Sequence, residues 1–382
     1  MTTCKICVVD DSFPGFSLDD KGVCNYCKLH HEMENEMPND HRGTEIINKK
    51  ILSIKKRNKN SDYDVVVGIS GGRDSTYLLY YLTKIQKLRC LAIHMNDGFG
   101  NPVAGKNMEN ATKILNVDFK VFTTDWKLSK DLKKSFLKAC VPDIETPTDI
   151  AIASALYAAC VQYHVKDIFI GQSFRTEGIS PLEWNFLDGK YVKDVQKKYG
   201  TEKFPSWEPN KLCFDLDIKK MFYYVFIKRI NTFNPFYYLD YNRKNIDKII
   251  SKELNWQDTG AHYYDDLYQT LMSSWYKKKF GIDRRKFNYS ALIRSGQMTR
   301  DEALNKLEKD YVSNQDEMVA LCTKRIGITN EDLDSLIKNN SKNTFKNFNT
   351  SYNFLKYFSF AIKYLSKLNI LPTTTYYKYF KF

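Results

Sequence analysis

The chain has 382 residues, enough for about two domains at roughly 150 residues each. Hydrophobic residues make up 43% and charged residues 27%, values that exclude wholesale disorder, collagen and a coiled coil. No apolar run approaches the roughly 18 residues of a membrane span, and the chain opens on Cys4 and Cys7 rather than on a basic segment followed by an apolar one. We therefore expect a protein of the cytoplasm.

The formal net charge of +13 favours an anionic partner such as tRNA, a phosphorylated metabolite or an anionic membrane surface. Much of the excess is lysine, accompanied by many asparagines and aromatic residues. A genome with biased codon usage produces the same composition without any binding surface, so the charge is a weak signal. Nine cysteines are too few for a disulfide scaffold, and four of them form two close pairs near the N-terminus. This usage favours a reducing compartment and a metal site.

The N-terminal part of the chain divides into a cysteine-rich segment and a linker. Residues 1–32 contain too few large apolar residues to form a core unaided, so a further interaction must hold them together. Residues 33–60 are polar and compatible with helix, and their basic run from Lys49 to Lys59 is interpreted as a solvated helix face.

Strand and helix patterns alternate over residues 61–215. Strands are expected at Asp64–Ser70, Cys90–Met95, Phe119–Phe122 and Asp167–Gly171. Apolar residues at helical spacing separate these strands, first over residues 76–87. This order predicts an α/β fold with a parallel sheet, in which ligands lie beyond the carboxyl ends of the strands.

Residues 216–340 are expected to form a mostly helical C-terminal lobe, because the strand signal fades after Gly171. Helices are expected at Asp217–Thr232, Arg243–Glu253, Tyr263–Phe280 and Arg300–Lys309. The tail, residues 341–382, contains no acid, seven lysines and thirteen aromatic residues. Six apolar side chains of the tail share one helical face: Phe354, Phe358, Ala361, Ile362, Leu365 and Leu368. Such a stripe predicts a packed terminal helix, and the alternative is a surface that contacts a membrane or a partner.

A glycine loop joins the first expected strand to the first expected helix. Its residues are Ser70, Gly71, Gly72, Arg73, Asp74 and Ser75. Glycines let the chain turn tightly, and the start of the helix offers backbone N–H groups to an anion. Asp74 beside a phosphate requires a cation such as Mg²⁺ or an ammonium group between them. A plain glycine turn with Ser75 as the helix cap is the alternative, and the string matches neither a Walker loop nor Gly-x-Gly-x-x-Gly.

This Ser-Gly-Gly-x-Asp-Ser string resembles the signature of the PP-loop ATP pyrophosphatases, which adenylate a carbonyl-type oxygen and release pyrophosphate. The resemblance implies that residues 70–75 grip the ATP phosphates, with Asp74 near Mg²⁺ and pyrophosphate. It also implies that the adenine lies near the strand that ends at His94, and that Gly171 and Gln172 contact the far side of the nucleotide.

Two Cys-x-x-Cys turns, Cys4 with Cys7 and Cys24 with Cys27, enclose residues 8–23. Two such turns can supply four thiolates to one tetrahedral site, which favours structural Zn²⁺ and would provide the folding free energy that this segment lacks. An iron–sulfur cluster and a redox dithiol pair are the alternatives.

Several strings extend the resemblance to the WbpG-like N-acetyl sugar amidotransferases of surface-glycan biosynthesis. They are Gly22–Cys27, Gly171–Gly178, Leu187–Tyr191, Lys279–Arg285 and Ser295–Leu304. The resemblance covers Cys4 to Glu308, with the last seventy or so residues outside it. It implies that ATP adenylates the acetamido oxygen of a sugar and that ammonia displaces AMP to form an acetamidino group.

Candidate catalytic and substrate residues follow from this resemblance, each with a plain structural alternative. Glu177 could orient the acetamido N–H or take a proton from ammonium, and the alternative is pairing with Arg175. The substrate candidates are Trp184, Asp188, Tyr191, Arg284 and Arg285. The structural alternative for the two aromatics is packing in the core, and for Asp188 it is a place in a turn. For the two arginines the alternative is an exposed basic helix end.

No glutaminase nucleophile is visible in the sequence, so the resemblance implies a separate glutaminase subunit that supplies ammonia. The strongest rival interpretation is a tRNA thiolase that uses Cys140, Cys160 or Cys213 as a persulfide carrier or cluster ligand. A non-enzymatic zinc-ribbon module with a vestigial ATP site is a further alternative.

Overall fold

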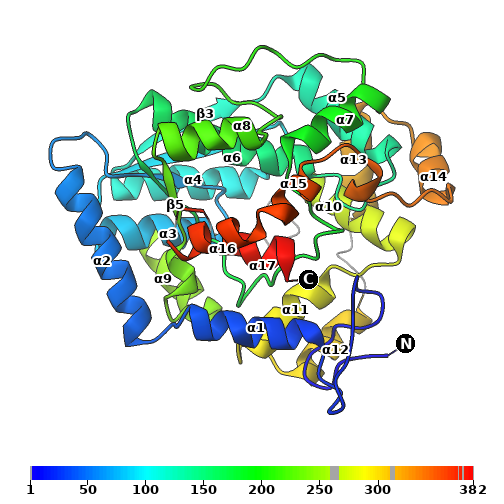
Figure 1. Ribbon diagram of the computed structural model, residues 1–382, viewed down its shortest axis with the longest axis horizontal. Coiled ribbons are helices and arrows are strands. Elements are labelled where there is room, and N and C mark those ends of the chain that lie inside the picture. The colour runs from blue at the N-terminus through cyan, green and yellow to red at the C-terminus, as the bar shows by residue number, and fades with distance from the viewer. Residues whose placement is uncertain (1, 259–265, 310–314, 369, 372–373, 382) are drawn as a thin grey trace.

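A five-stranded parallel sheet forms the centre of the protein (Figure 1), as seen in a computed structural model that describes residues 2–258, 266–309, 315–368, 370–371 and 374–381. The strands are β1 (Val65–Gly68), β2 (Cys90–Asn96), β3 (Asp118–Thr123), β4 (Asp167–Phe169) and β5 (Asn231–Phe233). Their order is β3-β2-β1-β4-β5, and every neighbouring pair is parallel. The predicted α/β class is confirmed.

Both faces of the sheet are buried at its centre, where alternate strand side chains enter different cores, whereas the edge strand β3 is largely exposed. Val66, Leu91 and Ile168 enter one core. Three helices contribute to that core: α5 (Trp126–Lys138), α6 (Thr146–Gln162) and α7 (Gly189–Tyr199). Val67 and Phe169 enter the other core. Its helices are α2 (His41–Arg57), α3 (Arg73–Tyr80), α4 (Pro102–Leu115) and α9 (Arg243–Leu254). A valine buried in this way contributes about 1.5–3 kcal/mol relative to exposure, which explains the unbroken Val65–Val67 run.

The fifth strand corrects the expected helix at Asp217–Thr232. The helix there is α8 (Ile218–Phe222), which continues as the π-helical turn η2 (Tyr223–Ile227), and the chain then enters β5. β5 pairs with β4 through Thr232 and Ile168. A three-residue strand is too short to leave an alternating pattern in the sequence, so only its pairing partner reveals it.

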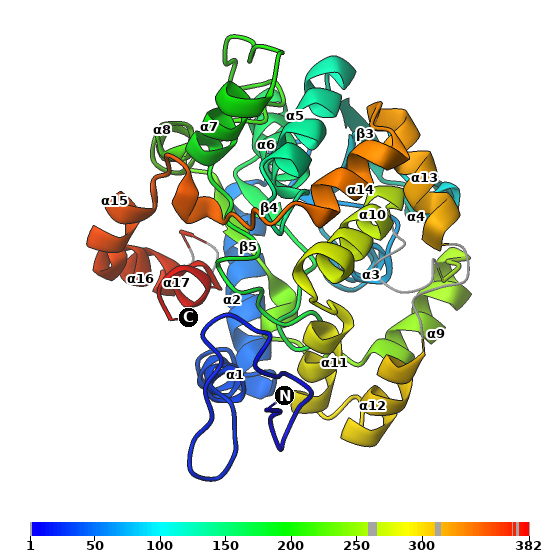
Figure 2. The same ribbon diagram turned by 90° about the vertical axis from the view of Figure 1, so that its right-hand side faces the viewer.

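The N-terminal loops fold against the C-terminal helices, while α1 contributes Leu29 and Met33 to the second core of the sheet. Short antiparallel bridges join Thr3 to Asp10 and Leu18 to Cys24, and α1 (Asn25–Glu36) follows. α1 crosses the expected boundary at residue 32. Figure 2 shows the N-terminal loops beside α11 (Arg285–Arg294) and α12 (Arg300–Glu308).

The C-terminal part is helical, as expected. The expected helix at Arg243–Glu253 is α9, and that at Arg300–Lys309 is α12. The expected helix at Tyr263–Phe280 is present as α10 (Leu267–Trp275) followed by the π-helical turn Tyr276–Phe280, while Tyr263 lies outside the described residues. α13 (Gln315–Ile326) and α14 (Asn330–Lys338) complete this part.

The tail forms several short helices, so the expected single packed stripe is wrong. α15 (Tyr352–Tyr357) ends at Phe358, and α16 (Ser359–Lys367) and α17 (Thr374–Phe380) follow. Of the predicted stripe, Ile362 is buried, whereas Phe354, Phe358 and Leu368 are exposed. Within the described residues, no helix is both long and apolar enough to cross a membrane.

Candidate functional site

The candidate site lies where the strand order of the sheet reverses. β1 is followed by β2 and β3 on one side and pairs with β4 on the other. In α/β sheets, ligands bind beyond the carboxyl ends of the strands at such a reversal point, here those of β1 and β4. The glycine loop follows β1, and Gly171 comes directly after the end of β4. Topology therefore brings the two predicted nucleotide-binding segments to one edge of the sheet.

Gly71 and Gly171 are required by close backbone approaches at this edge. Gly71 has a φ of +79°, and a Cβ there would lie 2.0 Å from the carbonyl oxygen of Ala104. A Cβ on Gly171 would lie 3.0 Å from the carbonyl oxygen of Asp74. A side chain at residue 71 would thus face both an unfavourable backbone conformation and a clash with α4.

The loop is held from outside through the carbonyl of Gly71. Trp256 Nε1 and Asn107 Nδ2 each donate a hydrogen bond of 3.0 Å to Gly71 O. Asn107 also donates to the carbonyl of Gln257 at 2.8 Å, which joins α4 to the segment after α9. These contacts fix the bend from α4 and from the segment after α9.

The start of α3 is available to an anion. Gly72 is the N-cap residue, and no side chain caps the helix. The predicted cap, Ser75, makes other contacts: its hydroxyl lies 3.1 Å from Ser70 Oγ, accepts from Ser70 N and donates to Gly72 O. The first N–H groups of a helix seek an acceptor, and the two serine hydroxyls stand beside them.

Arg73 and Asp74 have partners on or near α9 that the sequence did not indicate. Arg73 pairs with Asp247, and its guanidinium lies 5.7 Å from the ring centre of Trp256. Asp74 accepts a hydrogen bond from the phenol of Tyr241. Burial first, and then the Asp74 carboxylate, raise the pKa of Tyr241 well above its ordinary value, so the phenol remains a donor.

His94 and Gln172 lie at the same edge. His94 Nδ1 lies 3.2 Å from the carbonyl oxygen of Ile69, the residue before the loop. Burial lowers the pKa of His94, so its ring is neutral near pH 7. The carbonyl of Gln172 accepts from Asn234 Nδ2 at 2.6 Å, and the residue is exposed. The nucleotide-binding candidates therefore follow or end strands at the same edge of the sheet.

Glu177 lies in the turn after Gly171 and is half-buried. Its backbone N–H donates to Ser173 O at 2.8 Å. The neighbouring guanidinium of Arg175 donates to the carbonyls of Met37 and Tyr237 and lies 3.6 Å from Glu34. Arg175 thus joins α1 to the turn that carries Glu177.

The two aromatic substrate candidates are core residues. Trp184 packs against Phe13 with ring centres 4.7 Å apart, and its carbonyl accepts from the phenol of Tyr276. Tyr191 packs against Phe136 and is buried. Neither ring face is open to a sugar or a base, which corrects the proposed stacking role.

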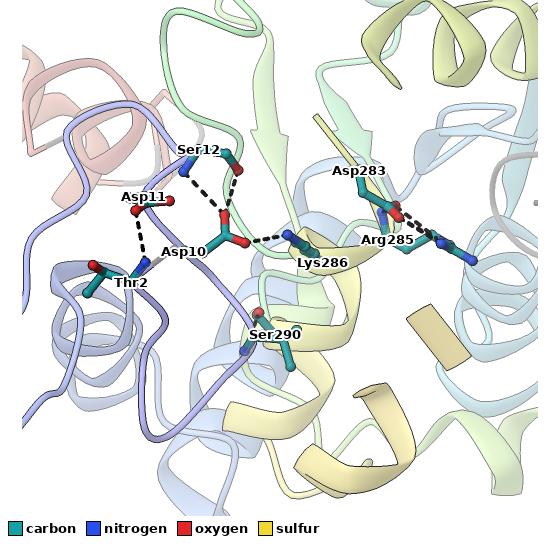
Figure 3. Close-up of polar contacts among 9 residues, drawn as sticks. Thr2, Asp10, Asp11, Ser12, Asp283, Arg285, Lys286 and Ser290 are labelled. Carbon is teal, nitrogen blue, oxygen red and sulfur yellow. Dashed lines mark hydrogen bonds and ion pairs between the residues drawn. The ribbon is translucent and has the colours of Figure 1, made fainter. Parts of the chain in front are cut away.

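The three charged substrate candidates have structural partners. Asp188 caps α7 through Lys190 N and also accepts from the N–H and hydroxyl of Ser351, which ties the tail to the sheet domain. Arg285 pairs with Asp283, as Figure 3 shows, and donates to three carbonyls at the end of α12. Arg284 is half-buried, donates to Gln269 Oε1 at 2.9 Å and stacks over Tyr276. The expected exposed basic helix end is therefore also wrong.

A buried group of carboxylates, missed at the sequence level, precedes and begins α6. Its members are Asp143, Glu145 and Asp149. Because α6 runs back to the start of the parallel strand β4, its N-terminus lies on the carboxyl-end side of the sheet. Asn185 Nδ2 donates to Asp143 at 2.5 Å and to Asp149 at 3.1 Å.

The carboxylates are close enough to disfavour one another's ionisation, and this raises their pKa values. Burial first, and then the neighbouring Asp149, raise the pKa of Asp143 to about 6. The same two causes raise the pKa of Glu145, whose Oε2 accepts from Gln269 Nε2 at 2.5 Å. A group of this kind can hold a proton near neutral pH.

A hollow of about 390 Å³ lies beside the edge strand β3. Its lining includes Thr123, Asp125, Phe204 and Cys213. None of the predicted nucleotide or substrate residues lines it, so it does not define the site.

The four N-terminal cysteines meet in one buried cluster and could hold a metal ion. The Sγ atoms lie 3.9 Å apart for Cys4 and Cys27, 3.8 Å for Cys7 and Cys24, and 3.6 Å for Cys27 with either Cys7 or Cys24. Four thiolates around one tetrahedral Zn²⁺, at about 2.3 Å each, stand about 3.8 Å apart. Thiolates bound to the separate irons of a cubane cluster must stand farther apart, so the spacing fits a single ion.

The cluster is joined to the C-terminal helices by two arginines. Arg294 donates to Cys7 Sγ and Cys27 Sγ, each at 3.3 Å, and Arg300 donates to the carbonyls of Cys4 and Cys7. Burial alone would lower the pKa of Arg294, but the thiolates outweigh it and raise the pKa. Four thiolates on a divalent ion leave a net charge of −2, which this cation offsets.

Further contacts dock the same segment on α11 (Figure 3). Asp10 pairs with Lys286, and Val8 N donates to Ser290 Oγ at 3.2 Å. The missing core of residues 1–32 is thus supplied by the C-terminal helices together with the cysteine cluster.

The other cysteines are buried, including all three thiolase candidates. Burial raises the pKa of the Cys160 and Cys213 thiols, and Cys213 Sγ accepts from Ser154 Oγ at 3.3 Å. Cys140, Cys160 and Cys213 therefore behave as small core residues.

Residues 259–363 match a family model described as LPS biosynthesis protein WbpG-like, C-terminal domain. This segment is WbpG-like. The resemblance to WbpG-like proteins drawn from the sequence is confirmed here. The match also runs past Glu308, where that resemblance was expected to end, and includes α13, α14 and α15. The WbpG-like segment carries Arg294 and Arg300, so it supplies the cations beside the cysteine cluster.

No curated protein matches the chain. Similar solved structures include an NH₃-dependent NAD synthetase from Campylobacter jejuni, at 16% identity and a TM-score of 0.32, covering 79% of this chain and 94% of that one. A U34-tRNA thiolase from Methanococcus maripaludis has 12% identity and a TM-score of 0.31, covering 89% and 97%. An NMN synthetase from Francisella tularensis has 13% identity and a TM-score of 0.29, covering 79% and 94%.

Substituting Gly71 tests the close approach of the loop. Gly71→Ala is expected to destabilise the protein by about 2 kcal/mol or more, because it adds both a strained φ and a clash with Ala104. Gly105→Ala is the matched control: it adds the same methyl group on α4 with nothing within 4 Å, and a gain of about 0.5–1 kcal/mol is expected. Urea unfolding measures both, and equal stability of the two variants would contradict the proposed packing.

Removing one thiolate tests the cysteine cluster. Cys24→Ser is expected to lower the bound metal, measured by elemental analysis, from one ion per chain to near zero, because three thiolates no longer close the site. Hydrogen exchange of residues 2–32 is expected to accelerate, while Cys90→Ala, which removes a buried thiol outside the cluster, retains the metal. A chelator that strips the metal without changing exchange in this segment would argue against its folding role.

The raised pKa of Asp143 predicts a dependence of stability on pH. Its folded-state pKa of about 6 exceeds the ordinary value of 3.8, so the folded protein holds a proton that the unfolded chain has lost. The stability from this group is present below about 3.8 and is lost as pH rises through about 6. Asp143→Asn is expected to make this decline shallower in urea unfolding from pH 4 to 7, while Asp118→Asn on the edge strand keeps the wild-type slope.

Proposed function

We propose that this protein is an ATP-dependent amidotransferase that converts the acetamido group of a sugar or nucleotide-sugar into an acetamidino group in surface-glycan biosynthesis. The observation that carries the proposal is the glycine loop at the reversal point of the sheet, with Gly71 pressed against α4 and the start of α3 free of a side-chain cap. The WbpG-like segment over residues 259–363 supports the substrate class.

The chemical task is to activate an unreactive amide. In the first step the acetamido oxygen attacks the α-phosphorus of ATP, an O-adenylyl imidate forms and pyrophosphate leaves. In the second step ammonia adds to the imidate carbon, a proton is lost, and the C–O bond breaks to release AMP and the amidine. Since the imidate hydrolyses readily, the site must hold both substrates together and exclude water.

The residues at the carboxyl ends of the strands suit these tasks. The N–H groups of the loop and of the start of α3 would bind the triphosphate, with Ser70 and Ser75 as additional donors. The Asp74 carboxylate is a suitable Mg²⁺ ligand, and such an ion would offset phosphate charge during adenylation. The neutral His94 would lie toward the base, and Glu177 remains the proposed residue for orienting the acetamido group or receiving a proton from ammonium.

A separate glutaminase subunit is proposed as the source of ammonia. A cysteine-based glutaminase requires an accessible thiol, and all nine cysteines of the chain are buried. Adenylation of a tRNA base for thiolation is the alternative use of the same loop. It is less well supported, because its three candidate sulfur carriers lie in the core.

Product analysis tests the proposal. The protein with ATP, Mg²⁺, an ammonium salt and a panel of acetamido nucleotide-sugars is expected to release AMP and pyrophosphate, and mass spectrometry is expected to show oxygen replaced by NH. Asp74→Asn is expected to slow AMP release by about 10²–10³-fold, because the carboxylate that would hold the phosphate-neutralising Mg²⁺ is lost.

Asp118→Asn is the matched control, since it makes the same change at the opposite end of the sheet and is expected to retain activity. Release of ADP and phosphate instead of AMP would overturn the proposal. AMP release that requires tRNA instead of a sugar would favour the thiolase alternative. Glutamine used by the purified chain alone would refute the separate glutaminase.

A further inference from the structure

The helices of the tail expose an unusual concentration of aromatic side chains. Tyr357 is 84% exposed, Phe360 83%, Tyr364 60% and Phe354 56%. Leu368 and Phe358 extend this group at 51% and 44%. We refer to these six residues as the aromatic face.

The aromatic face belongs to α15, α16 and the residues that cap them; α16 has a packed inner side, whereas α15 buries none of its residues. On α16, Ile362 and Ser366 are buried, whereas Phe360 and Tyr364 stand one turn apart on the outer side. On α15, the ring of Phe358 lies 4.8 Å from that of Phe354 and 5.1 Å from that of Tyr357. Asp188 anchors the start of this region through Ser351. Ser351 and the inner side of α16 therefore attach this region to the rest of the protein, while the rings remain exposed.

Positive charge accompanies the rings. Lys356, Lys363 and Lys367 on α15 and α16 are all exposed. No aspartate or glutamate occurs anywhere in residues 341–382. Acids of α1 approach the tail at α17, where Glu32 pairs with Lys381. A protein partner commonly presents mixed charges, whereas the rings and lysines of α15 and α16, which contain no acid, complement an anionic lipid headgroup layer.

A second group of exposed apolar residues lies on the same side of the molecule. Phe222, Phe226 and Ile227 of α8 and η2 are 54%, 43% and 61% exposed. Figure 2 shows α8, α15 and α16 on the same side of the molecule, with α15 between the other two. The neighbouring Lys219 and Arg229 are exposed as well. The exposed residues of the 219–229 segment and of the tail helices thus comprise two apolar groups and five cations.

We propose that this side binds peripherally to an anionic lipid surface, with Tyr357, Phe360 and Tyr364 inserted at headgroup level and the lysines on the lipid phosphates. Aromatic side chains favour the membrane–water boundary, where the ring leaves water and the polar edge stays hydrated. No helix has to span the bilayer for this attachment. The binding is independent of the proposed amidotransferase activity.

Vesicle flotation tests the proposal with the full chain. The wild-type protein is expected to float with vesicles of phosphatidylglycerol and phosphatidylcholine, to float weakly with phosphatidylcholine alone, and to be released by high salt. Lys356→Gln/Lys363→Gln/Lys367→Gln is expected to weaken partitioning by roughly a hundredfold on the anionic vesicles. Tyr357→Ser/Phe360→Ser/Tyr364→Ser is expected to weaken it at least about tenfold at every salt concentration.

Leu52→Ser/Ile85→Ser is the matched control, because both residues are exposed, at 66% and 51%, on elements away from this side. The control is expected to bind like the wild type, and thermal unfolding checks that every variant is folded. Absence of wild-type binding, equal binding to neutral vesicles, or equal loss in the control would overturn the proposal. So would self-association, seen by light scattering, that disappears in the aromatic variant while vesicle binding stays unchanged.

Discussion

The carbonyl of Gly71 is the contact on which the candidate site depends. It accepts hydrogen bonds from Trp256 and Asn107, which come from the segment after α9 and from α4. The residue itself is pressed against Ala104 in a left-handed conformation. Since the loop is fixed from two sides, its N–H groups need little reorganisation to receive a triphosphate, which is what preorganised electrostatic stabilisation requires.

The polar contacts around the loop are coupled to one another. Arg73 is turned toward Asp247 and Trp256, while Asp74 is hydrogen-bonded to Tyr241. The segment from Tyr241 to Trp256 therefore touches three positions of the loop. A nucleotide that displaces one of these contacts also acts on the others, so α9 and its flanks belong to the site as much as the loop does.

The N-terminal and C-terminal parts of the chain depend on each other through charge. The cysteine cluster would carry excess negative charge in a buried place if it held a divalent ion, which is unfavourable without a nearby cation. Arg294 and Arg300 provide that cation from the WbpG-like segment. The same contacts give residues 2–32 the packing that their own composition cannot provide.

The sequence by itself determined the local features. Hydrophobic runs located four strands, the glycine string located the loop, and two Cys-x-x-Cys pairs located the metal-type cluster, because short-range spacing encodes each of them. Only the tertiary structure placed Tyr241 on Asp74 and Arg294 on the cysteines, and only it made Trp184, Tyr191 and Asp188 structural. It also separated the tail into a buried side and an exposed aromatic side. These outcomes depend on packing between residues more than a hundred positions apart, or on which face of a helix meets the core, and neither leaves a local pattern in the chain.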